Sequence, residues 1–354
     1  MEGDGYLKQY CRTLPLQVSA IPVGRMRQKI IAVFLFLFLT PLSSLAASKP
    51  QRVGIVLPDD EWLSSVEGFK EGMKGLGYVE GRDIQYLFEN AKGDMKKVSE
   101  TTKRFVAVKV DAIFTITNTA LKVVAEITRT SKTPVVFGSA SGPVESGIMP
   151  AQTTPDTHIS GVTSSSIELV GKRLEILKEV LPQIKRVVVL GATGSDSSEA
   201  AFAAAKEAAS KLGITIIEFR ARSREDAIQT PKKITRKEAD AFFLIPGLYV
   251  VGAVREIALE AKSARMPFVG YQVEHVKKNG ALLGYGSSFY LQGKQSALLV
   301  DKVLKGVHPS KIPIERSSLH QLVLNLDTAE EIGIRFSPEV LNRADELVGG
   351  GSKR

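Results

Sequence analysis

The sequence has few of the residues that form disulfides, redox centres or metal sites. Its 354 residues include one cysteine, Cys11, and four histidines. A single cysteine forms no disulfide within the chain. The histidines are scattered, with no H-E-x-x-H motif or other paired metal-ligand spacing; they are His158, His275, His308 and His320. We therefore expect neither a metal site nor a cofactor.

Long apolar runs are equally scarce. The single one, Ile30–Leu39, has ten residues, whereas a membrane-spanning helix needs about 20. Basic residues precede this run from Arg25 onward, and small residues follow it up to Ala46. This order is typical of a secretory signal peptide, and the short apolar run disfavours the alternative, a membrane anchor. We expect cleavage after Ala46 or Ala47, so that residues 1–47 form the signal peptide and an upstream extension.

Met26 lies where such a signal peptide would begin, so Met1 and Met26 are both candidate translation starts. Cleavage also removes Cys11 and leaves the mature chain without cysteine. A lipoprotein needs a cysteine directly after the cleavage site, so this class is excluded. The sequence predicts a soluble exported protein, periplasmic if the cell has an outer membrane.

Composition and charge exclude further classes. The chain is 44% hydrophobic and 24% charged, which argues against a collagen-like, low-complexity or polytopic membrane protein. Its length suggests roughly two domains of about 150 residues each. The net charge is +9, but basic residues lie beside acidic ones along the predicted helices, as in Lys172–Glu175. That pattern is typical of solvated helix faces, so we expect no nucleic-acid partner.

Strand-like apolar runs alternate with helical patterns from Val53 onward. In the first half we expect strands near Val53–Leu57, Ile84–Phe88, Ala112–Ile116 and Val135–Phe137, with helices near Met95–Val108 and Ala120–Thr128. In the second half we expect strands near Val187–Leu190, Ile214–Phe219, Ala241–Ile245, Phe268–Gly270 and Ala281–Leu283, with helices near Glu199–Leu212, Asp226–Lys237 and Gly252–Ala264. Strands separated by single helices pair in parallel, because a parallel return needs a crossover. The pattern predicts an α/β fold with two doubly wound parallel-sheet lobes. We interpret the segments near Ile159–Ser166 and Ile312–Leu326 as hinge strands, and residues 349–354 as a flexible tail.

The first predicted helix follows the strand at Val53–Leu57. Its apolar residues recur at helical spacing, and they are Val66, Phe69, Met73 and Leu76. Ser64–Glu67 has the pattern of a capping box. Trp62, the single tryptophan, precedes this box, which favours an indole on a loop at the mouth of a cleft. The alternative is a core position, because Trp62 falls on the same helical face as the apolar residues.

The sequence shows no catalytic constellation. Gly138–Gly142 is similar to a nucleophile elbow, but its central residue is Ala140 rather than serine. The glycines between Gly75 and Gly81 have the wrong spacing for a dinucleotide fingerprint, and the sequence has no Walker motif. We therefore expect a protein that is not an enzyme.

Polar, glycine-bearing sequence follows the predicted strands at their carboxyl ends. Ligands of open α/β sheets bind at this edge, where helix amino termini offer free N–H groups. Thr117 and Ser139 add hydroxyl groups there, although ordinary helix caps and turns use the same residue types. The candidate ligand-binding residues are Asp59, Asp60, Trp62, Thr117, Asn118, Thr119, Gly138, Ser139, Ala140, Thr193, Ser195, Pro246, Gly247, Tyr271 and Gln272.

Several short blocks, taken in order, resemble one exported solute-binding family. They include Gly68–Phe69, Leu76–Gly81, Lys109–Ile113, Thr133–Phe137, Gly161–Val162, Gly171–Glu179, Val300–Gly306, Asn325–Ala329, Gly333–Ile334 and Arg343–Glu346. Their order and spacing resemble the ABC-transporter substrate-binding proteins of the tryptophan/tyrosine-uptake-like group, which have a type I periplasmic-binding-protein fold. The resemblance covers about residues 50–348.

This resemblance implies two lobes joined by three hinge strands, with the ligand held between them. The first lobe would comprise residues 48–162 and 287–316, and the second would comprise 163–286 and 317–348. The implied ligand contacts are Pro58–Asp60, Thr117–Thr119, Gly138–Ser141, Thr193–Ser195, Pro246–Leu248 and Tyr271–Gln272. The chain departs from the family at Gly142–Val144, where many members have Asp-Pro-Val, and at Thr117–Thr119, where relatives often have a Gly/Thr-Pro turn. The identity of the ligand is therefore not carried over, and an aromatic amino acid is one option.

The implied function is that of a solute receptor. Such a protein captures a small polar ligand, such as an amino acid or a related compound, and delivers it to an ABC permease in the inner membrane. We expect it to act as a monomer. Two alternatives stay open, a ligand-binding partner of a membrane sensor and an exported α/β enzyme. A repressor's sensor domain has the same fold, but the signal peptide and the missing helix-turn-helix argue against it.

Overall fold

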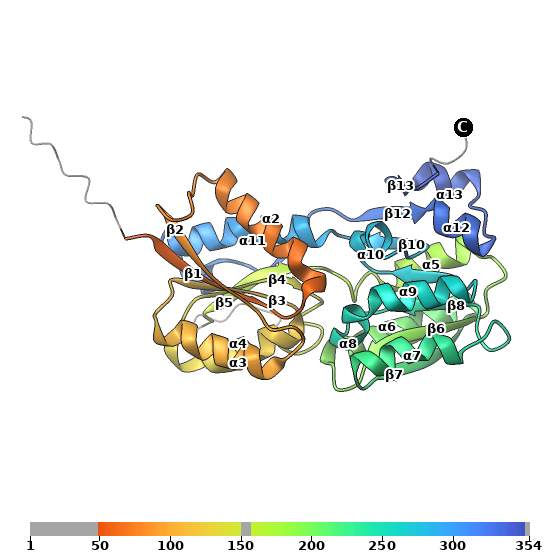
Figure 1. The fold of residues 1–354 in the computed structure, drawn as a ribbon, viewed down its shortest axis with the longest axis horizontal. Coiled ribbons are helices and arrows are strands. Elements are labelled where there is room, and N and C mark those ends of the chain that lie inside the picture. Colours follow the sequence, from red (N-terminus) through yellow and green to blue (C-terminus); the bar gives the residue numbers. More distant parts are fainter. Residues whose placement is uncertain (1–48, 150–156, 351–354) are drawn as a thin grey trace, which may run out of the picture. The chain divides into compact units, whose positions relative to one another are not determined.

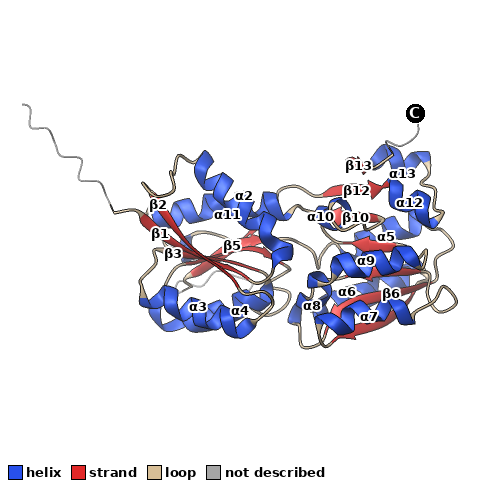
Figure 2. Ribbon diagram, viewed as in Figure 1, coloured by secondary structure: helices blue, strands red, loops and turns tan. Residues whose placement is uncertain are grey.

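The computed structural model describes residues 49–149 and 157–350. The predicted signal peptide and most of the predicted tail lie outside the described residues. From Lys49 onward the chain belongs to one unit, whose described strands form a six-stranded sheet and a seven-stranded sheet (Figures 1 and 2). Each sheet is covered by helices on both faces, which confirms the predicted α/β fold class with two parallel-sheet lobes.

The first lobe is built on a sheet whose neighbouring strands all run parallel. Its order is β11-β5-β4-β3-β1-β2. The strands are β1 (Gln51–Leu57), β2 (Ile84–Asn90), β3 (Ala112–Ile116), β4 (Val135–Ala140), β5 (Ile159–Thr163) and β11 (Glu315–Arg316). β3, β4 and β5 are buried along their whole length. Central strands of a parallel sheet are covered on both faces, which is why these segments are continuous apolar runs.

Four helices in the described residues complete the first lobe. α2 (Leu63–Gly75) and α11 (Phe289–Leu304) cover one face of the sheet, whereas α3 (Met95–Ala107) and α4 (Asn118–Ser131) cover the other (Figure 1). α2 and α11 approach closely because glycines line their contact. A Cβ on Gly68 would lie 1.9 Å from the Tyr290 carbonyl oxygen, and one on Gly293 would lie 1.9 Å from the Ser65 carbonyl oxygen. Through this contact α11, which comes late in the chain, becomes part of the first lobe.

The second lobe is built on the sheet β13-β12-β10-β9-β8-β6-β7, which is parallel except for the antiparallel pair β10–β12. Its strands are β6 (Arg186–Ala192), β7 (Thr215–Ala221), β8 (Ala241–Leu244), β9 (Phe268–Gly270), β10 (Leu283–Gly286), β12 (Gln321–Asn325) and β13 (Glu346–Val348). Its helices are α5 (Val170–Val180), α6 (Asp196–Leu212), α7 (Arg224–Lys233), α8 (Leu248–Gly252), α9 (Val254–Ser263), α10 (Val273–Lys277), α12 (Leu326–Ile332) and α13 (Pro338–Arg343). α5 and α6 pack on Val187 and Val189, whereas α8 and α9 pack on the opposite face at Val188.

The chain passes between the two sheets three times. It leaves the first sheet after β5, returns after β10 to form α11, and leaves again after β11 to form β12. Ser164–Ser166, Ser287–Ser288 and Ser317–His320 are the connecting segments. The exact domain boundaries that the resemblance implies stay a prediction.

Several details of the predicted elements are wrong, and two of them bear on the packing of the lobes. The strand predicted at Ala281–Leu283 begins two residues later, and the Leu282 side chain packs in a small cluster with Ala329 and Ile332. The capping box is also wrong, because the 3₁₀ turn η1 (Asp60–Trp62) leads directly into α2 at Leu63. Ser64 therefore lies inside the helix, and its buried hydroxyl has no hydrogen-bond partner among the described atoms.

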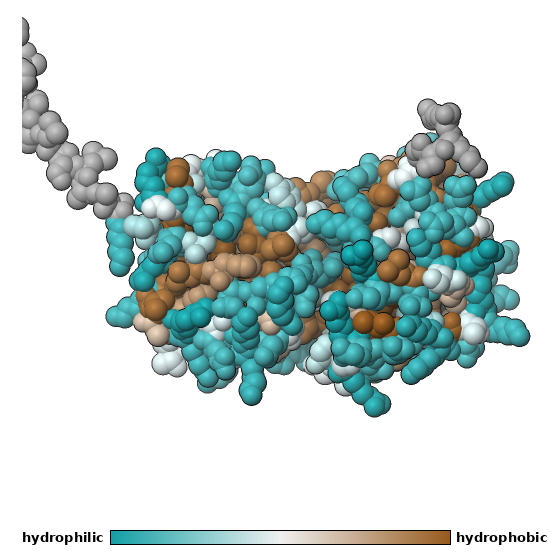
Figure 3. Space-filling view, in the orientation of Figure 1, coloured by the Kyte–Doolittle hydropathy of each residue, from teal (hydrophilic) through white to brown (hydrophobic). Residues whose placement is uncertain are grey.

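Hydrophilic side chains cover most of the face drawn in Figure 3, with apolar residues between them in small patches. Lys172 pairs with Glu175 at 3.0 Å, and both side chains are about half exposed, as a solvated helix face requires. For Arg173, which lies between them in the chain, the prediction of a solvated face is wrong, because its side chain is fully buried. None of the helices in the described residues is long and apolar enough to cross a membrane.

Candidate functional site

Three residues near the carboxyl ends of β3, β4 and β5 have positive φ angles although they carry a Cβ. They are Thr117 (φ 73°), Ser139 (φ 54°) and Ser165 (φ 52°). All three are buried. A positive φ is strained for such residues, most of all for a β-branched threonine. Because strained polar residues gather at binding sites, this edge of the first sheet is the first part of the candidate site.

The predicted segment Thr117–Thr119 forms the start of α4, which begins before the helix start predicted at Ala120. Thr117 caps the helix with its side chain, and Asn118 and Thr119 form its first turn. The Asn118 side chain donates to the Ser141 carbonyl at 3.1 Å and accepts from the Ser141 N–H at 2.9 Å. It also donates to the Ser146 hydroxyl at 2.7 Å. Asn118 therefore holds the segment that follows β4.

Gly138, Ser139 and Ala140 are the last three residues of β4, which extends beyond the strand predicted at Val135–Phe137. A Cβ on Gly138 would lie 2.9 Å from the Phe114 ring, so close packing requires glycine there. The Ser139 hydroxyl lies 3.4 Å from the Ser65 hydroxyl on α2. The Ala140 carbonyl accepts hydrogen bonds from β5 and from the segment after it.

The predicted residues after β1 separate into an exposed and a buried group. The Asp59 side chain caps η1, and burial raises the pKa of its carboxyl group. Asp60 is exposed, and its ion pair with Lys92 at 2.6 Å lowers the pKa of its carboxyl group. Trp62 is 3% exposed and belongs to the core, with its ring 6.2 Å from that of Phe289. Its contact with a ligand stays a prediction.

A hollow of about 500 Å³ is lined by residues of both lobes beside η1. The first lobe contributes mainly acidic side chains and the second mainly basic ones. The acidic residues are Asp59, Asp60, Glu61 and Glu67, and the basic residues are Arg224, Arg255 and Lys278. Burial raises the pKa of Glu61 to about 7, and the charge of Glu274 adds to this effect. The Glu61 carboxylate lies 3.4 Å from the Asn279 side-chain amide of the second lobe.

Four predicted residues lie together at the carboxyl ends of β6 and β8. The hydroxyl of Ser198 connects the ends of these two strands, because it accepts from the Ala192 N–H at 3.0 Å and donates to the Pro246 carbonyl at 2.6 Å. Ser195 caps α6 by accepting from the Ser198 N–H. Thr193 is exposed, and Gly247 lies where a Cβ would come 3.0 Å from the Ala192 nitrogen.

Tyr271 and Gln272 follow β9 and connect the two lobes. Both side chains are buried, at 2% and 0% exposed. The Tyr271 hydroxyl lies near the side chain of Ser141 in the first lobe. The Gln272 side chain donates to the Ser166 hydroxyl at 3.3 Å and lies 3.4 Å from the Gln292 amide on α11. The structure thus brings the ends of β4 and β9 together. Among the described residues, no recorded hydrogen bond joins this pair to the group around Ser198.

Sequence reasoning missed the polar cluster on which Tyr271 and Gln272 rest, which we call the hinge cluster. Its members are Ser164, Ser165, Ser166, Arg173, His275 and Gln292, all buried. Two signals in the sequence point to it. A run of three serines directly follows β5, and Arg173 lies on the apolar face of α5 together with Val170, Leu174 and Leu177. A charged residue in such a stripe is costly unless it has a specific role.

Burial decides the protonation of the hinge cluster. It lowers the pKa of His275 to about 3, and the Arg173 charge adds to this effect, so the imidazole is neutral near pH 7. The His275 Nδ1 atom lies 3.3 Å from the Tyr271 N–H, from which it accepts a hydrogen bond. The guanidinium of Arg173 is also shifted, because burial lowers its pKa to about 9.

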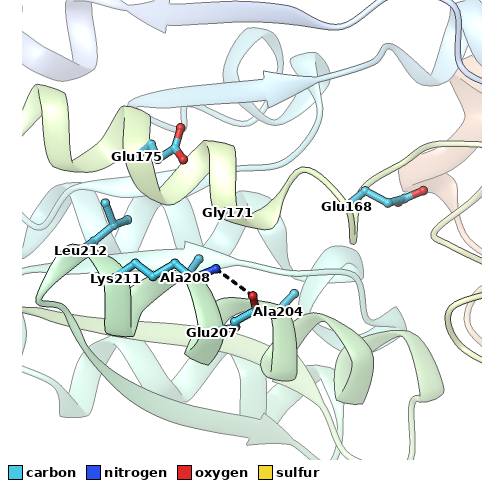
Figure 4. A pocket seen from close by; sticks show the side chains of 8 residues that line it. All are labelled: Glu168, Gly171, Glu175, Ala204, Glu207, Ala208, Lys211 and Leu212. Carbon is cyan, nitrogen blue, oxygen red and sulfur yellow. Dashed lines mark hydrogen bonds and ion pairs between the residues drawn. The ribbon is translucent and has the colours of Figure 1, made fainter.

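A separate hollow of about 260 Å³ lies between α5 and α6 (Figure 4). Its lining includes Lys211 and Glu207, which pair with each other at 2.9 Å on the exposed surface of α6. It brings together none of the predicted site residues. Within the described residues, no group of histidine, cysteine or acidic side chains is placed to hold a metal ion.

The family model that describes ABC transporter substrate-binding proteins matches residues 52–348. The chain belongs to this family. Its members bind substrates rather than convert them, so the prediction that the chain is not an enzyme is confirmed. The resemblance inferred from the short sequence blocks is confirmed as well.

Three relatives place this substrate-binding protein more closely. A tyrosine-binding protein of Clostridioides difficile (strain R20291) is 23% identical over 269 residues, which cover 76% of each chain. A structure of a conserved domain protein from Vibrio cholerae is 24% identical, with a TM-score of 0.78 over 84% of this chain and 100% of that one. A Streptococcus structure of an ABC domain in complex with L-Trp is 21% identical, with a TM-score of 0.77 over 85% of this chain and 100% of that one. At these identities the solved structures establish the fold, which is that of the type I periplasmic binding proteins.

Proposed function

We propose that this substrate-binding protein is an exported receptor that captures a small polar ligand between its two lobes and delivers it to an ABC permease in the inner membrane. The observation that carries this proposal is the meeting of Tyr271 and Gln272 with Ser141 and Gln292. These groups come from different lobes and are buried where they meet. A ligand held at this place favours the arrangement in which the lobes touch, and a permease can recognise that arrangement.

An amino acid or a related compound is the ligand class that we propose. Two relatives support it, because one is named for tyrosine binding and the other was solved with L-Trp. The chemistry of the strand ends agrees with this class. Hydroxyls and amides of Ser139, Ser141 and Gln272 offer hydrogen bonds to the polar end of such a ligand, and the Tyr271 ring offers an apolar face.

A panel of ligands tests the proposal directly. The mature chain, starting after Ala47, would be screened by thermal unfolding against amino acids, short peptides, sugars and nucleosides. A specific ligand raises the free energy of unfolding by about 2.7 kcal/mol at a hundredfold excess over Kd. Calorimetry then measures the affinity, and a Tyr271→Ala variant is expected to bind more weakly. If no compound raises the unfolding temperature, the proposal is wrong.

Export and location are part of the proposal. The basic segment, the apolar run Ile30–Leu39 and the small residues up to Ala46 support a cleaved signal peptide. The intact mass of the protein from a periplasmic fraction is expected to correspond to a start at Ala47 or Ser48. Recovery of a chain that retains Ile30–Leu39 from the membrane pellet would exclude this location.

A further inference from the structure

The Arg173 side chain is a buried charge without a counter-ion. It is fully buried, and its two terminal nitrogens donate to backbone carbonyls, one to Ser166 and one, at 3.4 Å, to Tyr285. Its Nε atom has no hydrogen-bond partner among the described atoms. It forms no ion pair with a described acidic side chain, and Glu168, whose charge acts on it from a distance, faces Arg316 at 3.9 Å.

Such an arrangement costs free energy. Two neutral carbonyl oxygens replace only part of the hydration that the guanidinium loses, and buried cations are ordinarily paired with an anion. The neighbours of Arg173 do not provide one. The rings of Phe243 and Tyr271 lie 5.8 Å and 5.7 Å from its guanidinium carbon, and His275 is neutral.

The position of Arg173 links this unpaired charge to the candidate site. Its partner Ser166 also accepts the hydrogen bond from Gln272, and Tyr271, whose ring lies over the guanidinium, is near Ser141. Arg173 therefore lies directly behind the two residues at which the lobes touch. Separation of the lobes would remove Ser141 from Tyr271 and would leave the Tyr271 ring, which lies over the guanidinium, free to move away from it.

We propose that Arg173 is the residue that binds a carboxylate group of the ligand. This inference rests on the proposed function and names the ligand chemistry of that site. A planar guanidinium with a free Nε–H presents donors in the geometry that a carboxylate accepts. One positive charge surrounded by neutral groups matches a ligand group with one negative charge, and it does not match a phosphate dianion.

The amide of an amino acid is the neutral ligand that matches it most closely, because NH₂ replaces one carboxylate oxygen and removes the negative charge. Calorimetry would measure the Kd of L-tyrosine, L-tryptophan and the other amino acids of the panel against their amides, for the wild-type chain and for Arg173→Gln. A hydrogen bond to a charged group contributes about 10- to 100-fold in Kd. We expect the wild-type chain to prefer an amino acid over its amide by at least this factor and Arg173→Gln to lose the preference.

Two further variants separate recognition from folding. Arg173→Lys keeps the charge and is expected to restore part of the preference for the carboxylate. Arg186→Gln is the matched control. Arg186 is a partly exposed arginine at the amino end of β6, which is opposite to the carboxyl end at the candidate site, and it pairs with Asp240 at 2.9 Å. Unfolding without ligand would be measured for all variants. Removal of an uncompensated buried charge is expected to leave Arg173→Gln at least as stable as Arg186→Gln.

The outcomes distinguish this inference from the proposed function. Binding of an amino acid with the same preference over its amide in wild type and Arg173→Gln would overturn the role of Arg173 and leave the proposed function intact. Binding of a sugar or nucleoside, with no carboxylate ligand in the panel bound, would do the same. Failure of every compound to bind the folded wild-type chain would overturn both.

Discussion

Lys122 on α4 and Asp196 at the start of α6 form an ion pair of 2.6 Å that joins the first lobe to the second. Their side chains are 66% and 42% exposed, so solvent screens the pair and it stabilises the contact by at most about 1 kcal/mol. A small contribution of this kind suits a contact that must break and form again as the lobes open and close.

We expect Lys122→Ala to weaken ligand binding by about two- to fivefold without lowering the unfolding temperature. The substitution removes an interaction that exists only while the lobes touch. Calorimetry at low and high salt checks this, because salt weakens exposed ion pairs and the difference from wild type should shrink in high salt. Lys211→Ala, which removes a pair within α6, is the control. An equal loss of affinity in both variants would contradict the prediction.

Ligand affinity is expected to fall as the pH rises from about 4.5 to about 7. Contact between the lobes buries Glu61 and raises its pKa to about 7 from an ordinary value of 4.5. The touching arrangement therefore holds a proton that the open one releases in this range. Contact between the lobes is therefore favoured at pH values below this range and disfavoured above it. The equilibrium constant for contact changes by roughly tenfold for each unit by which the pKa of Glu61 is raised. Asp59 and Glu274 strengthen this effect and Lys278 opposes it.

Kd measured by calorimetry between pH 5 and pH 8 tests the role of Glu61. Glu61→Gln, which stays neutral, is expected to bind equally well across this range. Glu67→Gln, an exposed residue in the wall of the same hollow, should keep the dependence of the wild-type chain. A Glu61→Gln variant with an unchanged pH dependence would assign the effect to another group.

Thr117→Ala and Ser139→Ala are each expected to weaken ligand binding by about 10- to 100-fold if their hydroxyls bind a charged group of the ligand. Thr117→Ala also removes the cap of α4, which costs about 1 kcal/mol of stability. Unfolding experiments measure that cost, and calorimetry measures the affinity. Ser131→Ala, at the opposite end of α4, is the control. Lower stability with unchanged affinity would assign both hydroxyls to capping and packing alone.

Trp62 is expected to behave as a core residue. At 3% exposure and packed against Phe289, its indole should be poorly quenched by acrylamide. A saturating ligand that calorimetry has confirmed should leave its emission wavelength unchanged. Trp62→Phe provides the background from the tyrosines. A clear shift on binding would support instead the sequence-based prediction that the indole contacts the ligand.

The sequence by itself determined the class of this protein. Continuous apolar runs separated by single helices lead to parallel sheets, because no shorter connection returns a strand in parallel. The bounds of β3 and β9 agree with the apolar runs Ala112–Ile116 and Phe268–Gly270 that predict them. The same order placed Thr117, Ser139 and Tyr271 at strand carboxyl ends, since connectivity alone decides at which edge of a parallel sheet a segment emerges.

The tertiary structure alone decided which of these residues meet. Ser141 and Tyr271 are far apart in the chain, and they come together because the chain passes between the sheets three times. Trp62 became a core residue because α11 returns to pack Phe289 against it. Arg173 shows the limit most clearly. The sequence indicates a solvated helix face at Lys172–Glu175, but Arg173 within it is fully buried. A buried charge and its missing partner depend on what surrounds the side chain in space, and helical spacing does not encode that.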